Sequence, residues 1–283
     1  MILWSIPLIP RGATLDSAAQ GLYNSRYRDA ATTLKDFRPQ DPVLYIRTAW
    51  EFSGNWFADN AVGRSQTWIA AWRQFVTTFR SVSSRFRFDW CPNFGRTNMA
   101  PDSAYPGDAY VDIIGMDFYD ETVWCHITDP VGRWTSKMNQ AYGLKWHRDF
   151  AAAHGKPMSY PEWGVGGNEA GDAPYIVEQL YNWFRDNQVA YQTVWNSNSA
   201  YAGKLSDGQY PNAGAKYRQL YGVTVAVAAP GDVAVSRPVR STGALQVPRV
   251  YDTAARVLPA GHPAWRVEVH DQPGARPELR VIP

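Results

Sequence analysis

The sequence is poor in cysteine and has no long apolar run. Its two cysteines, Cys91 and Cys125, exclude a disulfide scaffold and a four-cysteine zinc site. A disulfide between them stays open, although two free thiols are favoured. No stretch approaches the roughly 20 apolar residues of a membrane span, so no membrane partner is expected. The start of the chain, residues 1–4, enters an apolar stretch without the basic region of a signal peptide.

Charge and motif content remove further function classes. The net charge is +2 with both signs interspersed, which argues against a nucleic-acid partner, because such proteins carry a concentrated basic face. No G-x-G-x-x-G or Walker sequence follows an expected strand, and G-x-S-x-G is absent. The five histidines show no H-E-x-x-H or other metal spacing. We therefore expect no cofactor and no catalytic metal.

Aromatic residues, in contrast, are abundant. The chain has 13 Trp, 16 Tyr and 11 Phe, together 14% of its residues. A tryptophan is costly to bury when its indole N–H lacks a partner. The excess therefore indicates either an aromatic-rich core or exposed flat platforms of the kind that sugar rings contact, and composition leaves both open.

Strands and helices are expected to alternate along the first 222 residues. Apolar runs predict strands at 2–9, 43–50, 86–90, 110–118, 157–163 and 191–195. Helical spacing and stop signals predict helices at 14–35, 65–82, 135–153, 174–187 and 214–221. Such alternation indicates a parallel sheet covered by helices. Acids and aromatics recur at the carboxyl ends of the strands, which favours a (β/α)8 TIM-type barrel over an open sheet.

The count of strands falls short of a closed barrel. Six strand–helix units are visible and eight are needed, so we expect two units before residue 2, or another segment or chain that completes the barrel. Residues 1–222 are assigned to the barrel. Residues 223–283 are assigned to a linker rich in Pro, Ala and Val and a small β-like tail of unknown role, with β-like runs at 245–250, 265–269 and 279–282.

Two glutamates end apolar strands beside tryptophans and are the candidates for chemistry. Glu51 follows the strand at 43–50, and Glu162 ends the strand at 157–163. Retaining hydrolysis of a glycosidic bond needs two carboxylates about 5–5.5 Å apart, and two strand ends at a barrel mouth can provide them. Arg47 shares a strand face with residues 49 and 51 by parity, so we expect it to point inward with Glu51.

Three motifs resemble those of family 26 glycoside hydrolases, which are (β/α)8 retaining β-glycanases. The run 50–56 (WEFSGNW) resembles the acid/base motif of that family. The run 105–115 (YPGDAYVDIIG) is similar to the segment that leads into its sixth strand, and 156–164 (KPMSYPEWG) resembles the strand with the nucleophile. The likeness extends over roughly residues 1–222 and rests on order and spacing.

The resemblance implies a role for individual residues. Glu51 would be the general acid/base and Glu162 the nucleophile, with Arg47 and Tyr119 as supporting residues that keep the nucleophile ionised and hydrogen-bonded. Trp195 would form the floor of the subsite for the cleaved sugar. The other candidates for substrate binding are Trp56, Trp90, Asn93 and Trp163.

The implied enzyme is an endo-type β-glycoside hydrolase that acts on a polysaccharide by double displacement. Mannan-degrading members have a histidine before the acid/base where this chain has Trp50, so a β-glucan, xylan or bacterial exopolysaccharide is at least as well supported as mannan. Apolar neighbours are expected to raise the pKa of Glu51, while Glu162 stays ionised near Arg47. The family resemblance implies a secreted or cell-envelope location.

Two other interpretations stay open. The chain could be a catalytically weak carbohydrate-binding or structural module of a larger assembly, such as a phage tail or a cell-surface complex. The presence of Glu51, Glu162, Arg47 and Tyr119 together argues against it. A sugar-phosphate lyase is disfavoured by the lack of a Gly-rich phosphate site late in the barrel. Asp117 could line the cleft, but a structural hydrogen bond is the favoured interpretation.

Overall fold

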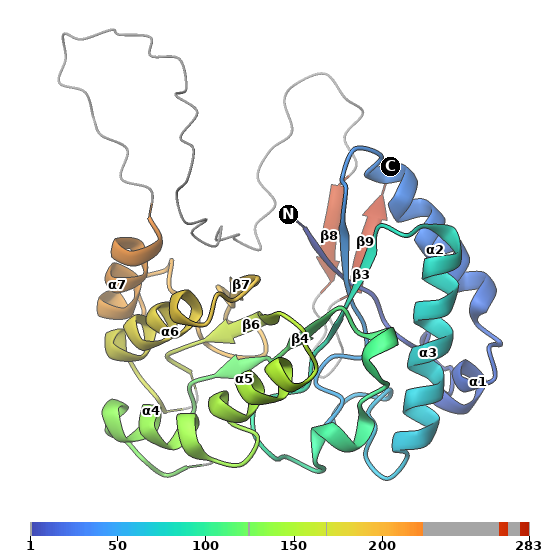
Figure 1. Cartoon of the computed structure of the whole chain (residues 1–283). Coiled ribbons are helices and arrows are strands. Elements are labelled where there is room, and N and C mark those ends of the chain that lie inside the picture. The colour runs from blue at the N-terminus through green and yellow to red at the C-terminus, as the bar shows by residue number, and fades with distance from the viewer. Residues whose placement is uncertain (1, 124, 168, 223–265, 271–277, 283) are drawn as a thin grey trace, which may run out of the picture.

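The computed structural model describes residues 2–123, 125–167, 169–222, 266–270 and 278–282 (Figure 1). Its strands are β1 (Leu3–Ser5), β2 (Leu44–Arg47), β3 (Phe86–Trp90), β4 (Ile113–Gly115), β5 (Phe118–Tyr119), β6 (Met158–Gly164), β7 (Tyr191–Val194), β8 (Arg266–His270) and β9 (Glu278–Ile282). Its α-helices are α1 (Leu15–Ala19), α2 (Asn24–Phe37), α3 (Ser65–Val82), α4 (Pro130–Asn139), α5 (Leu144–Ala153), α6 (Pro174–Asp186) and α7 (Pro211–Tyr221). Two 3-10 helices, η1 (Pro101–Ala104) and η2 (Asp108–Tyr110), precede β4.

The strands β1 to β7 form one parallel sheet in which neighbours along the chain are neighbours in space. The order is β1, β2, β3, β4, β6, with β5 and β7 also paired to β6. β4 and β5 pair with successive parts of β6, so they are two pieces of one strand. The described residues thus supply six strand positions with helices between them, which confirms the predicted α/β barrel architecture.

The sheet is strongly curved, because side chains from strands far apart in the sheet order meet inside it. Tyr191 of β7 donates a hydrogen bond to Asp89 of β3, and Ser159 of β6 donates to the same carboxylate. The rings of Tyr45 on β2 and Tyr191 lie 5.6 Å apart. A flat sheet would hold these strands well apart, so the inner face wraps around a common centre.

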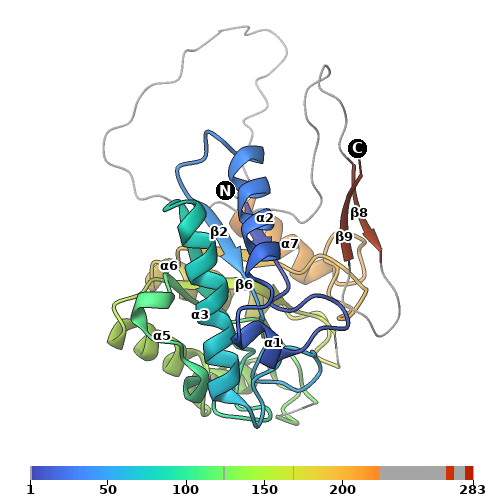
Figure 2. The same ribbon diagram turned by 90° about the vertical axis from the view of Figure 1, so that its right-hand side faces the viewer.

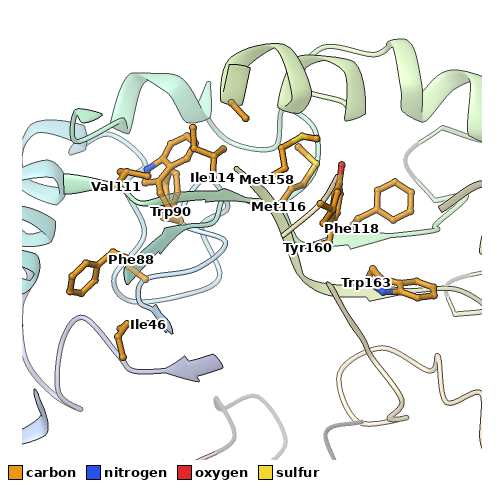
Figure 3. Close-up of a cluster of buried hydrophobic side chains, with 14 of the residues drawn as sticks. Ile46, Phe88, Trp90, Val111, Ile114, Met116, Phe118, Met158, Tyr160 and Trp163 are labelled. Carbon is orange, nitrogen blue, oxygen red and sulfur yellow. The ribbon is translucent and has the colours of Figure 1, made fainter. Parts of the chain in front are cut away.

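The helices cover the outer face of the sheet. Figure 2 shows α2 and α3 side by side over β2. The helix expected at 65–82 is confirmed as α3, and its buried face carries Trp68, Trp72, Phe75, Val76 and Phe79. A second part of the core lies between the sheet and the later helices and includes Ile114, Met158 and Tyr160 (Figure 3).

Three expected elements are interrupted. The expected helix at 14–35 breaks into α1 and α2 at Gly21, whose φ is +77°. The expected helix at 135–153 is two helices, α4 and α5, separated around Gly143, where an added Cβ would lie 2.4 Å from the Lys137 carbonyl oxygen. The expected strand at 110–118 breaks between β4 and β5.

The C-terminal residues contain one described hairpin, in which β8 and β9 pair antiparallel. It matches the β-like runs expected at 265–269 and 279–282, whereas the run at 245–250 lies outside the described residues. The division of the chain after residue 222 stays a prediction. Cys91 and Cys125 are free thiols. Within the described parts of the chain, no helix combines the length and apolar character that crossing a bilayer requires.

Candidate active site

Arg47 lies at the centre of a buried charge cluster at the carboxyl ends of the strands. Its Nη1 donates to both carboxylate oxygens of Asp117, at 2.9 and 3.0 Å, and its Nη2 donates to Oε1 of Glu162. Its Nε contacts the Ser5 hydroxyl at 3.2 Å. Burial lowers the pKa of Arg47, but the carboxylates of Asp117 and Glu162 more than offset this and hold it above its ordinary value. One cation thus serves two acids.

Glu162 is held at both oxygens. Arg47 occupies Oε1, and the Tyr119 hydroxyl donates to Oε2 at 2.8 Å. The carboxylate still reaches solvent, with its side chain 17% exposed. Its orientation is therefore fixed by two donors from other strands while one side stays open. Such fixed orientation is what a reacting group needs.

Glu51 reaches the site through a turn and not through the strand. β2 ends at Arg47, and both Ala49 and Glu51 have positive φ, +44° and +55°. The parity prediction for residues 49 and 51 is therefore wrong. The turn is held by the Glu51 N–H, which donates to the Cys91 carbonyl at 2.8 Å. Positive φ at two non-glycine residues marks a strained segment that the surroundings enforce.

Trp56 folds back over this turn, and its Nε1 donates to Oε2 of Glu51 at 2.8 Å. The turn admits the ring only because residue 54 is glycine, where an added Cβ would lie 2.1 Å from the indole. The Trp56 ring is half exposed. One aromatic side chain thus both binds the acid and offers a free face beside it.

Glu51 and Glu162 both lie close enough to Tyr119 and Asp117 to raise the pKa of these two groups. Burial raises the pKa of Tyr119 well above its ordinary value, and the charges of Glu162 and Glu51 both add to the rise. Burial also raises the pKa of Asp117 well above the usual range; Arg47 opposes the rise, and Glu162 and Glu51 reinforce it. The predicted partners Glu51, Glu162, Arg47 and Tyr119 therefore lie in one site.

Of the predicted substrate-binding residues, two are accessible at the strand ends and three are buried in the core. Trp195 is half-buried beside Tyr119, with ring centroids 6.4 Å apart. Trp195 and the exposed Trp56 are both accessible at the strand ends, and their role in substrate binding stays a prediction.

The other three assignments are wrong, because their side chains belong to the core. Trp90 is fully buried against Phe52, and its Nε1 donates to the Ala104 carbonyl. Trp163 is one of the buried core side chains in Figure 3; its ring contacts Phe184 of α6, and its Nε1 donates to Gln192. Asn93 is 6% exposed and bonds Ser53 and Thr97. None of these groups can stack on or bind a sugar.

Sequence reasoning underrated two neighbours of Arg47. Asp117 is bonded to Arg47 inside the site, and Cys91 donates from its thiol to the same carboxylate at 3.2 Å. The signal for Asp117 was its place at a strand end, two residues before Tyr119. The guanidinium of Arg47 also lies 4.8 Å from the ring centre of Trp50, a cation–π contact. In the described part of the chain, no three His, Cys, Asp or Glu residues are grouped as a metal site requires.

Comparison with known proteins identifies the chain. The sequence profile described as Glycosyl hydrolase family 26 matches residues 13–156, about half of the chain. The chain belongs to this family. It is 26% identical over 209 residues to Endoglucanase H of Acetivibrio thermocellus, a match that covers 66% of this chain and 21% of that protein.

Solved structures of family 26 proteins have the same fold. A mannanase of Bacillus subtilis is 19% identical with a TM-score of 0.50, over 73% of this chain and 56% of that one. A family 26 β-mannanase of Bacteroides ovatus is 17% identical with a TM-score of 0.52, over 72% and 60%. At these identities the likeness concerns the fold alone. The chain spans little more than half of these structures and about a fifth of the curated relative.

Proposed function

We propose that this chain carries the active site of a retaining β-glycoside hydrolase, with Glu162 as nucleophile and Glu51 as general acid/base. The observation that supports the proposal is the environment of the Glu162 carboxylate. A solvent-reachable carboxylate is fixed at both oxygens by Arg47 and Tyr119 at the strand ends. A purely structural carboxylate would gain nothing from being held rigid and left open to solvent.

The reaction proceeds in two displacements. Glu162 attacks the anomeric carbon while the proton on Glu51 passes to the departing glycosidic oxygen. Water then attacks the glycosyl-enzyme ester, gives its proton to Glu51, and releases Glu162. Arg47 donates to Oε1 of Glu162, and the Tyr119 hydroxyl donates to Oε2, so both oxygens of the attacking carboxylate are held in place before the attack.

The substrate we propose is a β-linked polysaccharide cut internally, as the family resemblance implies. The names of the relatives point to β-glucan and to mannan. Trp50 stands where mannan-degrading members have a histidine, and its ring lies over Arg47. An indole can donate a hydrogen bond but, unlike an imidazole, cannot accept one beside the acid/base, so we favour β-glucan and keep mannan, xylan and bacterial exopolysaccharide in the test.

The test is hydrolysis of these polysaccharides, read as newly formed reducing ends. We expect Glu162→Gln to abolish turnover on the preferred substrate. Glu51→Gln should remain inactive on polysaccharide but regain activity with azide on a substrate with a good leaving group, giving a β-glycosyl azide. Undiminished hydrolysis by Glu162→Gln would remove it from the nucleophile role. Binding without cleavage of any polysaccharide would favour the carbohydrate-binding module instead.

A further inference from the structure

A groove of about 350 Å³ is lined by residues of α4, α5 and α6. These helices lie beside one another in the helix layer (Figure 1). The groove wall includes Trp134 from α4, Arg148 from α5, and Gln179, Asn182, Trp183 and Asp186 from α6. The α6 residues recur at helical spacing and so form one face of that helix. None of these side chains belongs to the candidate active site.

Trp134 supplies accessible aromatic surface in this groove. Its side chain is partly buried against the core, and its indole N–H has no hydrogen-bond partner among the described residues. Trp183 differs, because it is 8% exposed and its Nε1 donates to the Tyr160 hydroxyl at 2.7 Å. The Trp134 indole therefore offers both a flat apolar surface and an unused donor.

Two amide side chains of the groove are also unused. Gln179 and Asn182 are partly exposed, and neither amide has a hydrogen-bond partner within the described residues. Each amide offers two donors and an acceptor. A ligand with many hydroxyl groups can satisfy both kinds, because a hydroxyl donates and accepts.

The charges at the groove are already neutralised by neighbours outside it. Arg148 donates to Asp149 at 2.7 Å, and Asp186 accepts from Arg185 at 2.8 Å. The groove therefore has no net charge to attract a phosphate or another ionic ligand. Its volume suits a small ligand or a short chain segment. A protein partner would need a far larger surface, about 800 Å² per partner.

We propose that this groove is a second carbohydrate-binding site, in which a neutral sugar ring stacks on Trp134 and its hydroxyls bond Gln179 and Asn182. The choice of polysaccharide as ligand rests on the proposed function. The site itself rests on the groove and its unpartnered polar groups. It would hold the polysaccharide on the helix layer while another part of the chain is cut at the strand ends.

The experiment is affinity electrophoresis of the full chain in gels that contain mixed-linkage β-glucan, glucomannan or arabinoxylan. Glu162→Gln serves as the background, so that the polysaccharide stays intact. We expect added Trp134→Ala to weaken retention by about fivefold on at least one polysaccharide, the size of one lost aromatic contact. Gln179→Ala with Asn182→Ala should weaken retention of the same polysaccharide without touching the core.

The matched control is Val131→Ala, an exposed α4 residue that does not line the groove. It should leave retention unchanged, and in the active background Trp134→Ala should leave kcat/KM on a short oligosaccharide within twofold. Retention that depends on Trp56 but not on Trp134 or the two amides would overturn the proposal, as would no retention in any gel. Groove-dependent retention without hydrolysis would refute the proposed function alone.

Discussion

Two buried arginines, Arg47 and Arg133, form ion pairs close to Tyr119, and the two clusters differ in their balance of acids and bases. Arg47 is one cation bonded to two acids, Asp117 and Glu162. Arg133 bonds Asp120 through both of its carboxylate oxygens, and Lys137 lies 3.9 Å from the same acid. The first cluster therefore has an excess of acid and the second an excess of base.

The two clusters also differ in the partners of the charge that is left over after the arginine is paired. In the Arg133 cluster, spare donors go to backbone carbonyls: Arg133 to Thr128, and Lys137 to Tyr119 at 3.2 Å. That charge fixes the loop around the Tyr119 strand end. In the Arg47 cluster the second acid, Glu162, accepts from the Tyr119 hydroxyl instead, and its carboxylate still reaches solvent. Surplus carboxylate beside an opening is the arrangement that glycoside hydrolysis needs.

Replacement of each arginine in turn is the most direct test of whether the two clusters differ in role. We expect Arg47→Met to lower kcat/KM by about 10²–10³, because it removes a donor aimed at the proposed nucleophile, Glu162. Arg133→Met should leave kcat/KM within about tenfold but lower the free energy of unfolding by about 3–5 kcal/mol, because it leaves Asp120 buried without its main partner. Kinetics at a temperature where both variants are folded, together with urea unfolding, separate the two effects. Equal kinetic losses would show that the clusters do not differ in role.

The acids of the two clusters should also differ in what they contribute to stability. Asp120→Asn strands two buried cations, so we expect a loss of about 3–5 kcal/mol in the free energy of unfolding. Asp117→Asn should cost about 1 kcal/mol, because burial already raises the pKa of Asp117 and an amide oxygen can still accept from Arg47. Urea unfolding of both variants at pH 7 measures the difference. A larger loss for Asp117→Asn would contradict this order.

The sequence located the two acids but not how the chain presents them. Glu51 follows an apolar strand, so alternation predicts its direction. The actual direction depends on a hydrogen bond to Cys91 and on a turn with two positive φ angles. Such a turn is enforced by contacts with residues 40 positions away, which no local pattern contains.

The tryptophans show a second limit. In a parallel sheet covered by helices, both faces of a strand are buried, so alternation does not reveal which face a residue occupies. Trp163 and Trp195 both end apolar strands, yet the former packs among helices and the latter borders the site. The regular α3 stripe, in contrast, was predictable because its period matches a helix with a single buried face.

His147 and Tyr160 form a buried hydrogen-bonded pair without an ionic partner, and its contribution to stability should depend on pH. His147 bonds the Tyr160 hydroxyl and the Ile114 carbonyl, and burial lowers its pKa from 6.5 to about 4. Between pH 6.5 and 4 the imidazole binds a proton more readily in the unfolded chain than in the folded one. The contribution of neutral His147 to the stability of the folded state is therefore complete above pH 6.5 and is lost as the pH falls toward 4. The full loss is about 3 kcal/mol.

Urea unfolding of the wild type and His147→Gln at pH 7, 6 and 5 tests this. The stability of the wild type relative to the variant should fall across the series. Burial raises the pKa of Asp89 to about 6, which favours the folded state at low pH and reverses the sign, but Asp89 is common to both proteins and cancels in the difference. A difference that stays constant with pH would refute the neutral, buried state of His147.

The smallest effect is expected at Lys137, the second cation of the scaffold cluster. Lys137→Met removes the ammonium that lies over the rings of Phe94 and Phe118, and it leaves Asp120 paired with Arg133. Because burial disfavours the Lys137 ammonium and Asp120 keeps its Arg133 partner, we expect a change below about 1 kcal/mol at pH 7. Burial lowers the pKa of Lys137, so the unfolded chain holds this proton more tightly up to pH 10.5. The wild type should therefore gain stability relative to Lys137→Met as the pH rises from 7 toward 10.5 in urea unfolding. A relative loss over that range would mean that Asp120 and the carbonyls hold the ammonium more strongly than burial disfavours it, and the scaffold cluster would then depend on both of its cations.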